Sequence, residues 1–194
     1  MIRVIGGTAR GRLLKTPEGL STRPTGVRAR QFLFDVLAPQ VRESRFLDIF
    51  AGSGAMGIEA LSRGAAFAAF VESDPKALDT LRQNLKVTGF ASQTVVAARP
   101  WPAALGAIPG EYNLIFLDPP YGKGLVLPTL ESLERSTLLA PDAVVIDQCS
   151  PDEAPPPVVG GLTRYRENRI GQSLVFLYRR DQRERGLPPQ EERQ

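Results

Sequence analysis

From residue 45 onward, short and almost wholly apolar runs alternate with longer segments of helical periodicity. The apolar runs are residues 46–50, 67–72, 93–97, 113–118 and 143–148, and the helical segments are residues 55–63, 75–88, 101–106 and 125–137. Strands that are apolar on both sides suit a parallel sheet covered by helices on both faces. The alternation therefore predicts an α/β fold with a doubly wound, Rossmann-like sheet.

The pattern changes after residue 148. A loop rich in proline and glycine is followed by two runs typical of strands, residues 162–168 and 173–179, with a turn at Ile170 and Gly171. A hairpin after five β/α units predicts a mostly parallel sheet whose last strand is antiparallel. The charged segment 181–194 is expected to form a disordered tail.

Residues 1–40 precede these units and are expected to form a small arm. The sequence predicts a hairpin of strands 2–5 and 10–15, followed by a helix over 25–37. Residues 1–30 hold one acidic and seven basic residues, six of them arginines. A solvated basic surface is one explanation, but arginines suit bidentate contacts with phosphates, so we favour a nucleic-acid partner.

Histidine is absent from the sequence, which excludes catalytic triads and any imidazole base. The lone Cys149 cannot form an internal disulfide or a cysteine-ligated metal site, and it is expected to be a small core residue near a strand end. No metal is expected. Because no apolar run is long enough to span a membrane and the N-terminus does not resemble a secretory signal, we expect a soluble cytoplasmic protein.

A glycine loop, GSGAMG at residues 52–57, directly follows the first predicted strand and fits the dinucleotide pattern G-x-G-x-x-G. Asp48 lies four residues before Gly52, where a carboxylate would repel a pyrophosphate but would suit the ammonium group of S-adenosylmethionine. Glu72 ends the next predicted strand, where a carboxylate can accept hydrogen bonds from the ribose of either cofactor. Helix capping or solvation is the alternative role for both acids.

The sequence Asp118-Pro119-Pro120-Tyr121 ends the fourth of the predicted strands. Consecutive prolines cannot continue a central strand, so the chain leaves the sheet there in a rigid, extended form. In this arrangement Asp118 and the Pro119 carbonyl can accept both N–H bonds of an exocyclic amine, while Tyr121 stacks on the base. A strand-terminating turn with a buried aspartate is the alternative interpretation.

These motifs resemble those of class I S-adenosylmethionine-dependent methyltransferases with a D/N-P-P-Y/F motif. With "RVIGGTARGRLLKTP" and "TRPTGVRARQFLFDVL" near the N-terminus, residues 1–180 resemble the bacterial 16S rRNA guanine-N2 methyltransferases of the RsmD family. The resemblance implies methyl transfer from S-adenosylmethionine to the N2 amine of a guanine in 16S rRNA. The substrate would be the small ribosomal subunit or its late assembly intermediate, and residues 41–180 would form the methyltransferase domain.

The resemblance also implies roles for particular residues. Cofactor contacts are expected at Asp48, Phe50, Gly52, Gly54, Glu72 and Ser73. Catalytic contacts with the amine are expected at Asp118, Pro119, Pro120 and Tyr121. Contacts with RNA are expected from the arm, residues 1–40, at Arg3, Arg10, Arg12, Arg23, Thr25 and Arg28.

Two regions depart from the family pattern. Ala98 and Arg99 follow the third predicted strand, where the family usually has a polar residue that binds the adenine amine. Gln31 stands at a position where the family often has an acidic residue.

Three alternative functions stay open. The motif at 118–121 serves an adenine-N6 methyltransferase of DNA or RNA equally well, the glycine loop also fits an NAD-dependent oxidoreductase, and the basic arm fits a non-catalytic RNA-binding assembly factor.

Overall fold

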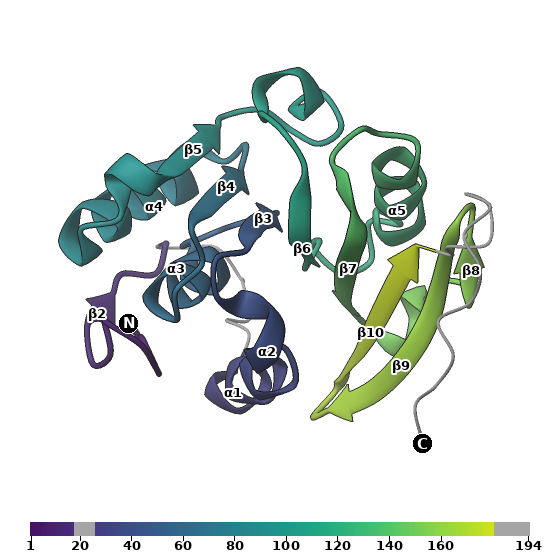
Figure 1. Cartoon of the computed structure of the whole chain (residues 1–194), viewed down its shortest axis with the longest axis horizontal. Coiled ribbons are helices and arrows are strands. Elements are labelled where there is room, and N and C mark those ends of the chain that lie inside the picture. Colours follow the sequence, from purple (N-terminus) through teal and green to yellow (C-terminus); the bar gives the residue numbers. More distant parts are fainter. Residues whose placement is uncertain (18–25, 181–194) are drawn as a thin grey trace.

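The computed structural model describes residues 1–17 and 26–180. Within these residues one sheet has the strand order β5-β4-β3-β6-β7-β10-β9-β8 (Figure 1). Its strands are β3 (Arg45–Ile49), β4 (Phe67–Val71), β5 (Thr94–Ala97), β6 (Tyr112–Leu117), β7 (Leu139–Cys149), β8 (Val158–Val159), β9 (Leu162–Ile170) and β10 (Ser173–Arg180). The strands from β5 to β7 are parallel, and β10 pairs antiparallel with both β7 and β9. The predicted sheet, mostly parallel with an antiparallel last strand, is confirmed.

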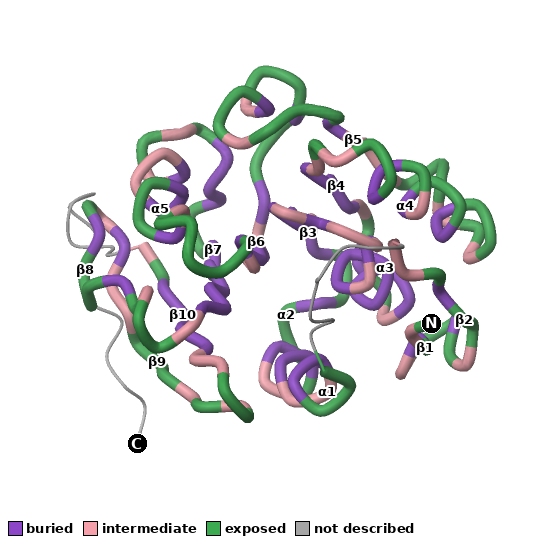
Figure 2. Tube along the Cα trace, turned by 180° about the vertical axis from the view of Figure 1, so that it is seen from behind, coloured by how far each residue is buried: buried purple, intermediate pink, exposed green. Residues whose placement is uncertain are grey.

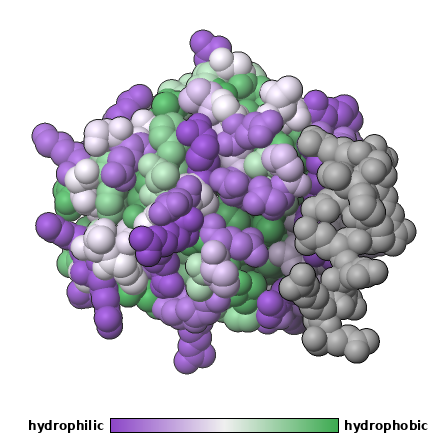
Figure 3. Space-filling model, in the orientation of Figure 1, coloured by the Kyte–Doolittle hydropathy of each residue, from purple (hydrophilic) through white to green (hydrophobic). Residues whose placement is uncertain are grey.

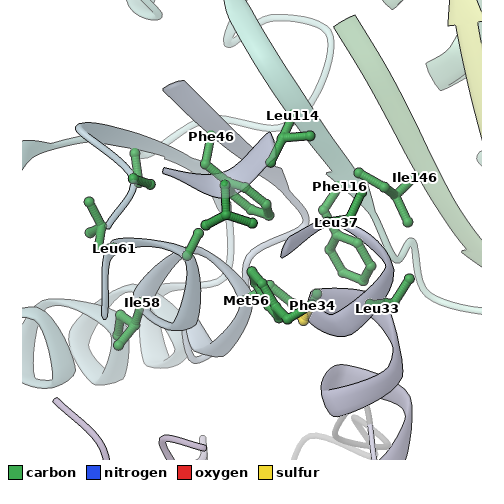
Figure 4. Packing of buried hydrophobic residues seen from close by; sticks show 14 of the residues in the cluster. Leu33, Phe34, Leu37, Phe46, Met56, Ile58, Leu61, Leu114, Phe116 and Ile146 are labelled. Atoms are coloured by element: carbon green, nitrogen blue, oxygen red, sulfur yellow. The ribbon is translucent and has the colours of Figure 1, made fainter. Parts of the chain in front are cut away.

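Helices cover both faces of the sheet. A first buried cluster includes side chains of α1 (Val27–Val36), α2 (Ala38–Val41), α3 (Ala55–Ser62) and α4 (Pro75–Thr88), and a second includes those of α5 (Val126–Glu134). Figure 4 shows the first cluster, in which Phe34 of α1 stacks on Phe46 of β3 with ring centres 6.3 Å apart. Figure 2 shows that buried residues follow the central strands. Apolar burial on both faces explains why these strands are nearly continuous in hydrophobic residues.

Local sequence signals fix where the helices begin and end. Asp74 caps α4 by accepting the N–H of Ala77 at 2.8 Å, Pro75 opens the helix, and Gly89 ends it with φ of 83°. In the described part of the chain no helix is both long and apolar enough to cross a membrane. Figure 3 shows one face of the molecule, where hydrophobic residues are visible between hydrophilic side chains.

Some element boundaries differ from the sequence prediction. The predicted helix over 101–106 is wrong: this segment forms turns and a short 3-10 helix, η2 (Leu105–Ala107). Pro100 and Pro102 supply no backbone N–H, and Gly106 disfavours a regular helix. β7 begins at Leu139, before the expected 143, and β8 lies in the segment that was expected to be a loop.

The first 17 residues pack on α3. β1 (Ile2–Arg3) and β2 (Leu13–Leu14) form an antiparallel pair, shorter than the predicted strands 2–5 and 10–15. The buried Glu59 of α3 accepts the N–H groups of Ile5 and Gly6 at 2.8 Å each. Gly7 has φ of 75°, and a Cβ there would lie 1.7 Å from the Ser62 carbonyl oxygen. Close backbone approach therefore requires glycine at this point of the arm.

Candidate active site

The glycine loop turns the chain sharply from β3 into α3. Phe50, Gly52 and Gly54 all have positive φ, of 67°, 54° and 77°. A Cβ on Gly54 would lie 2.2 Å from Leu81, whereas a Cβ on Gly52 would meet nothing within 4 Å. Gly54 is thus required for packing against α4, and the space beside Gly52 is open to a ligand.

Asp48 is buried at the end of β3, with 1% of its surface exposed. Its carboxylate accepts the N–H of Gly57, in the first turn of α3, at 3.1 Å. Burial raises the pKa of Asp48 well above its usual range, and the nearby carboxylates of Asp118 and Glu72 raise it further. Helix capping, the alternative that the sequence left open, is therefore present in this structure, and the ammonium contact stays a prediction.

Glu72 joins the loop to the end of β4. One carboxylate oxygen accepts the N–H of Gly52 at 2.8 Å, and the other accepts those of Ser73 and Asp74 at 2.7 and 2.8 Å. Glu72 is half-buried, and a carboxylate offers about four acceptor positions. It can therefore hold the loop and still accept a hydroxyl hydrogen bond.

The motif at 118–121 leaves the sheet beside the glycine loop. β6 pairs with β3 so that Leu117 lies opposite Ile49, which brings Asp118 next to Phe50. Asp118 is half-buried and Pro119 is buried, while Pro120 and Tyr121 are exposed. The tyrosine side of the motif thus faces solvent, with Tyr121 38% exposed, as a stacking surface for a base requires.

Two side chains from other strands support the motif. The amide of Gln148, on β7, donates to the Asp118 carboxylate at 3.3 Å. The hydroxyl groups of Tyr121 and Ser173, the first residue of β10, are 3.0 Å apart. Burial raises the pKa of Tyr121, so the hydroxyl stays protonated at neutral pH.

Glu153, in the 3-10 helix η3 (Pro151–Glu153), holds the loop after the motif. Its carboxylate accepts the N–H of Gly122 at 2.9 Å and that of Gly124 at 3.0 Å. The Ser150 hydroxyl donates to it at 3.1 Å, and these bonds, led by that of Gly122, lower the pKa of Glu153. Sequence reasoning missed Gln148, Ser173 and Glu153, because only the folded chain brings them to the motif.

The structure also locates the departures from the family pattern. Ala98 and Arg99 are exposed after β5, and the nearby Trp101 donates its ring N–H to Ser132 of α5 at 2.7 Å. Gln31 bonds Asp35 within α1 at 2.6 Å. Among the residues described, no group of three or more histidine, cysteine or acidic side chains could hold a metal ion. Cys149 is buried at the end of β7, as expected.

Four of the residues predicted to bind RNA are exposed: Arg3, Arg10, Arg12 and Arg28. Arg23 and Thr25 lie outside the described residues. Within the arm, the first three lie in residues 1–17, whereas Arg28 lies in the first turn of α1. Their contact with RNA stays a prediction.

Comparison with known proteins assigns the family. Residues 2–179 match the family described as conserved hypothetical protein 95. Ribosomal RNA small subunit methyltransferase D of Escherichia coli K12 is 37% identical over 180 residues, covering 93% of this chain and 90% of that protein. The relative of the same name from Buchnera aphidicola (Acyrthosiphon pisum) is 32% identical, covering 91% and 92%.

Solved structures agree with this assignment. The Escherichia coli protein yhhF is 39% identical with a TM-score of 0.82, and the match covers 93% of this chain and 98% of that one. A precorrin-6Y C5,15-methyltransferase from Geobacter metallireducens, 16% identical with a TM-score of 0.62, shares the fold over 86% of this chain and 93% of that one. The chain therefore belongs to the conserved hypothetical protein 95 family, the RsmD methyltransferases that its motifs resemble.

Proposed function

We propose that the protein methylates the exocyclic N2 amine of a guanine in 16S rRNA, with S-adenosylmethionine as the methyl donor. The observation that carries this proposal is the position of residues 118–121, at the carboxyl end of β6 and beside the glycine loop that follows β3. The similar Escherichia coli protein is named a small subunit rRNA methyltransferase. The substrate we propose is the small ribosomal subunit or its late assembly intermediate, so we expect the protein to act in the cytoplasm.

The residues around the loop fit this cofactor. The open space beside Gly52 admits a ligand next to the backbone, Glu72 can accept hydrogen bonds from ribose hydroxyls, and Asp48 can face an ammonium group. When bound, S-adenosylmethionine supplies a methyl group on a positively charged sulfur, which is already electrophilic. The protein consequently needs no histidine, and its task is to orient the amine.

Orientation is the role of residues 118–121. Asp118 and the Pro119 carbonyl accept the two N–H bonds of the amine, and the ring of Tyr121 stacks on the guanine. These contacts turn the nitrogen lone pair out of the plane of the base and toward the methyl group. The methylated amine is a strong acid and then loses a proton. Because the amine must enter a pocket, the target guanine lies in a loop or is extruded from its stack.

The test uses small ribosomal subunits from a strain that lacks the enzyme. Incubation with isotopically labelled S-adenosylmethionine should give labelled N2-methylguanine in 16S rRNA, identified by mass spectrometry of nucleosides. Asp118→Ala should abolish the label, whereas Asp79→Ala, on the exposed surface of α4, should retain it. Absence of label with the wild-type protein on subunits and on assembly intermediates would overturn the proposal.

The same assays separate the alternatives. Labelled N6-methyladenine would identify an adenine methyltransferase. Saturable binding of NAD in calorimetry, without a response to S-adenosylmethionine, would identify an oxidoreductase. If the wild-type protein and Asp118→Ala bind RNA equally well and neither methylates it, the protein is a non-catalytic RNA-binding assembly factor.

A further inference from the structure

The hairpin formed by β9 and β10 is strongly basic. Residues 162–180 hold five arginines and one glutamate, a net charge of +4, whereas the whole chain carries +3. The remaining residues therefore sum to −1. β8 pairs only with the first two residues of β9, so most of β9 is an edge strand of the sheet.

A register shift gathers side chains on one side of this hairpin. Arg166 pairs with Leu177 and Arg164 pairs with Tyr178, so Tyr165 has no direct partner across the strands. The Arg179 guanidinium lies 5.1 Å from the centre of the Tyr165 ring. Arg179 alternates with Leu177 and Val175 along β10, so it shares their side of the sheet. Bulges of this kind re-aim side chains, and here Tyr165 and Arg166 come to the same side.

This side is the one that α1 covers. Val175 and Leu177 are buried in the cluster that contains Leu33 and Phe34 of α1, and Ile170 of β9 packs against this cluster. The Arg166 guanidinium lies 5.8 Å from the ring centre of Phe32. Figures 1 and 2 show α1 beside the hairpin in both views. We call four residues here the hairpin face: the exposed Tyr165, Arg166 and Arg179, together with the half-buried Asn168.

The side of the hairpin that carries the hairpin face reaches the candidate active site at Ile170 and Ser173. Ser173, whose hydroxyl is 3.0 Å from that of Tyr121, lies opposite Ile170 and on the same side as Val175. From Ile170 this side of the hairpin follows β9 to Tyr165, a distance of about 17 Å for five residues of strand. Arg28 on α1 is one helical turn from Phe32 and continues the basic surface. A strand of RNA leaving the site could follow this path.

We propose that the hairpin face binds the RNA strand next to the target guanine. Arg166 and Arg179 bind phosphates, and Tyr165, 41% exposed, stacks on an unpaired base. Charge on an edge strand also prevents association between sheets, but this purpose needs neither the exposed tyrosine nor a common side. The inference rests on the proposed function, because it takes the target to be RNA.

The test compares two double variants with equal loss of charge. Arg166→Ala with Arg179→Ala removes the hairpin face. Arg169→Ala with Arg82→Ala is the control, because Arg169 pairs with Leu174 on the opposite side of the hairpin and Arg82 lies on α4. The substrates are small subunits from the strain lacking the enzyme and an RNA oligonucleotide with a guanine in its loop. Thermal unfolding checks that each variant is folded.

We expect the hairpin-face variant to raise KM for subunits and Kd for the oligonucleotide about tenfold, and to reduce the salt slope of binding by about 1.4, or about 0.7 for each lost phosphate contact. Its kcat and its affinity for S-adenosylmethionine should match the wild type, as should all values for the control. Replacing both arginines by lysine should keep the salt slope. Tyr165→Ala should weaken RNA binding at least about fivefold, and Tyr165→Phe should not.

Equal weakening in the two double variants, or none in either, would overturn the inference. Loss of S-adenosylmethionine binding in the hairpin-face variant alone would also overturn it, since the residues would then support the fold. Failure of the proposed function is a separate outcome: wild-type protein would methylate no subunits, while RNA binding would still distinguish the two double variants.

Discussion

The buried carboxylate of Glu59 on α3 lies 3.8 Å from the buried guanidinium of Arg30 on α1. Each partner also binds the first 17 residues: Glu59 accepts the N–H groups of Ile5 and Gly6, and Arg30 donates to the Arg3 carbonyl at 2.7 Å. Glu59 also pairs with Arg63, four residues later, at 2.8 Å, and together these charges join α1, α3 and residues 1–17. Because Glu59 and Arg30 are both out of water, neither can lose its partner without a large cost.

Glu59→Gln should lower the free energy of unfolding by about 3 kcal/mol or more, because Arg30 would stay charged and buried without its counter-ion. The arm should become accessible to trypsin at Arg10 and Arg12. Urea unfolding and mass spectrometry of brief digests measure the two effects. Glu43→Gln, at an exposed pair with Arg42, should change neither. A Glu59→Gln protein that matches the wild type in both assays would contradict this account.

Gly57→Ala should destabilise the protein by about 1–3 kcal/mol through overpacking. A Cβ at this position would lie 2.3 Å from the Phe70 ring of β4. Thermal unfolding measures the loss, and Gly106→Ala, where a Cβ would meet nothing within 4 Å, is the control. Adding Phe70→Leu should return part of the lost stability, because it makes room for the methyl group. Independent, additive effects of the two substitutions would refute the contact.

Binding of S-adenosylmethionine should release a proton at pH values below the raised pKa of Asp48. The raised pKa of Asp48 favours its neutral form, and an ammonium group beside it would favour the carboxylate and lower that pKa. Affinity should therefore increase with pH until the pH exceeds the pKa of Asp48 in the free protein. Calorimetry in two buffers of different ionisation enthalpy counts the protons. Asp48→Asn should remove the release and Asp79→Asn should not; an unchanged proton count in Asp48→Asn would exclude the predicted contact.

Asp147→Asn should stabilise the protein at pH 8 and leave it unchanged near pH 4. Burial, with the carboxylates of Asp118 and Glu153 nearby, raises the pKa of Asp147 from 3.8 to about 7. Between these values the folded state holds a proton that the unfolded state has released, so stability falls as pH rises, by up to about 4 kcal/mol. The asparagine side chain does not ionise, so the variant lacks this loss of stability at higher pH.

Urea unfolding at several pH values tests this prediction. Asp142→Asn, an exposed position on the same strand, should keep the pH dependence of the wild type. Parallel stability curves for Asp147→Asn and the wild type between pH 4 and 8 would show that Asp147 is not the titrating group.

The sequence predicted the sheet and both loops of the candidate site because each depends on local chemistry. Short apolar runs form the parallel strands, and consecutive prolines at Pro119 and Pro120 end β6. The supporting contacts could not be predicted in this way. Glu153 bonds the backbone of Gly122 and Gly124, and such bonds leave no pattern in the side chains of the loop. The failed helix at 101–106 shows how prolines override an apolar spacing.

The place of β10 in the sheet has a consequence for how the protein is made. This strand comes last along the described chain, yet it lies between β7 and β9. During synthesis, the edges of β7 and β9 that pair with β10 lack their partner until the segment up to Arg180 has left the ribosome. Unpaired strand edges can associate with other chains. Completion of the sheet thus requires that the chain has been synthesised through Arg180. A chain that is truncated before residue 173 lacks β10 and therefore cannot join β9 to β7 in the sheet.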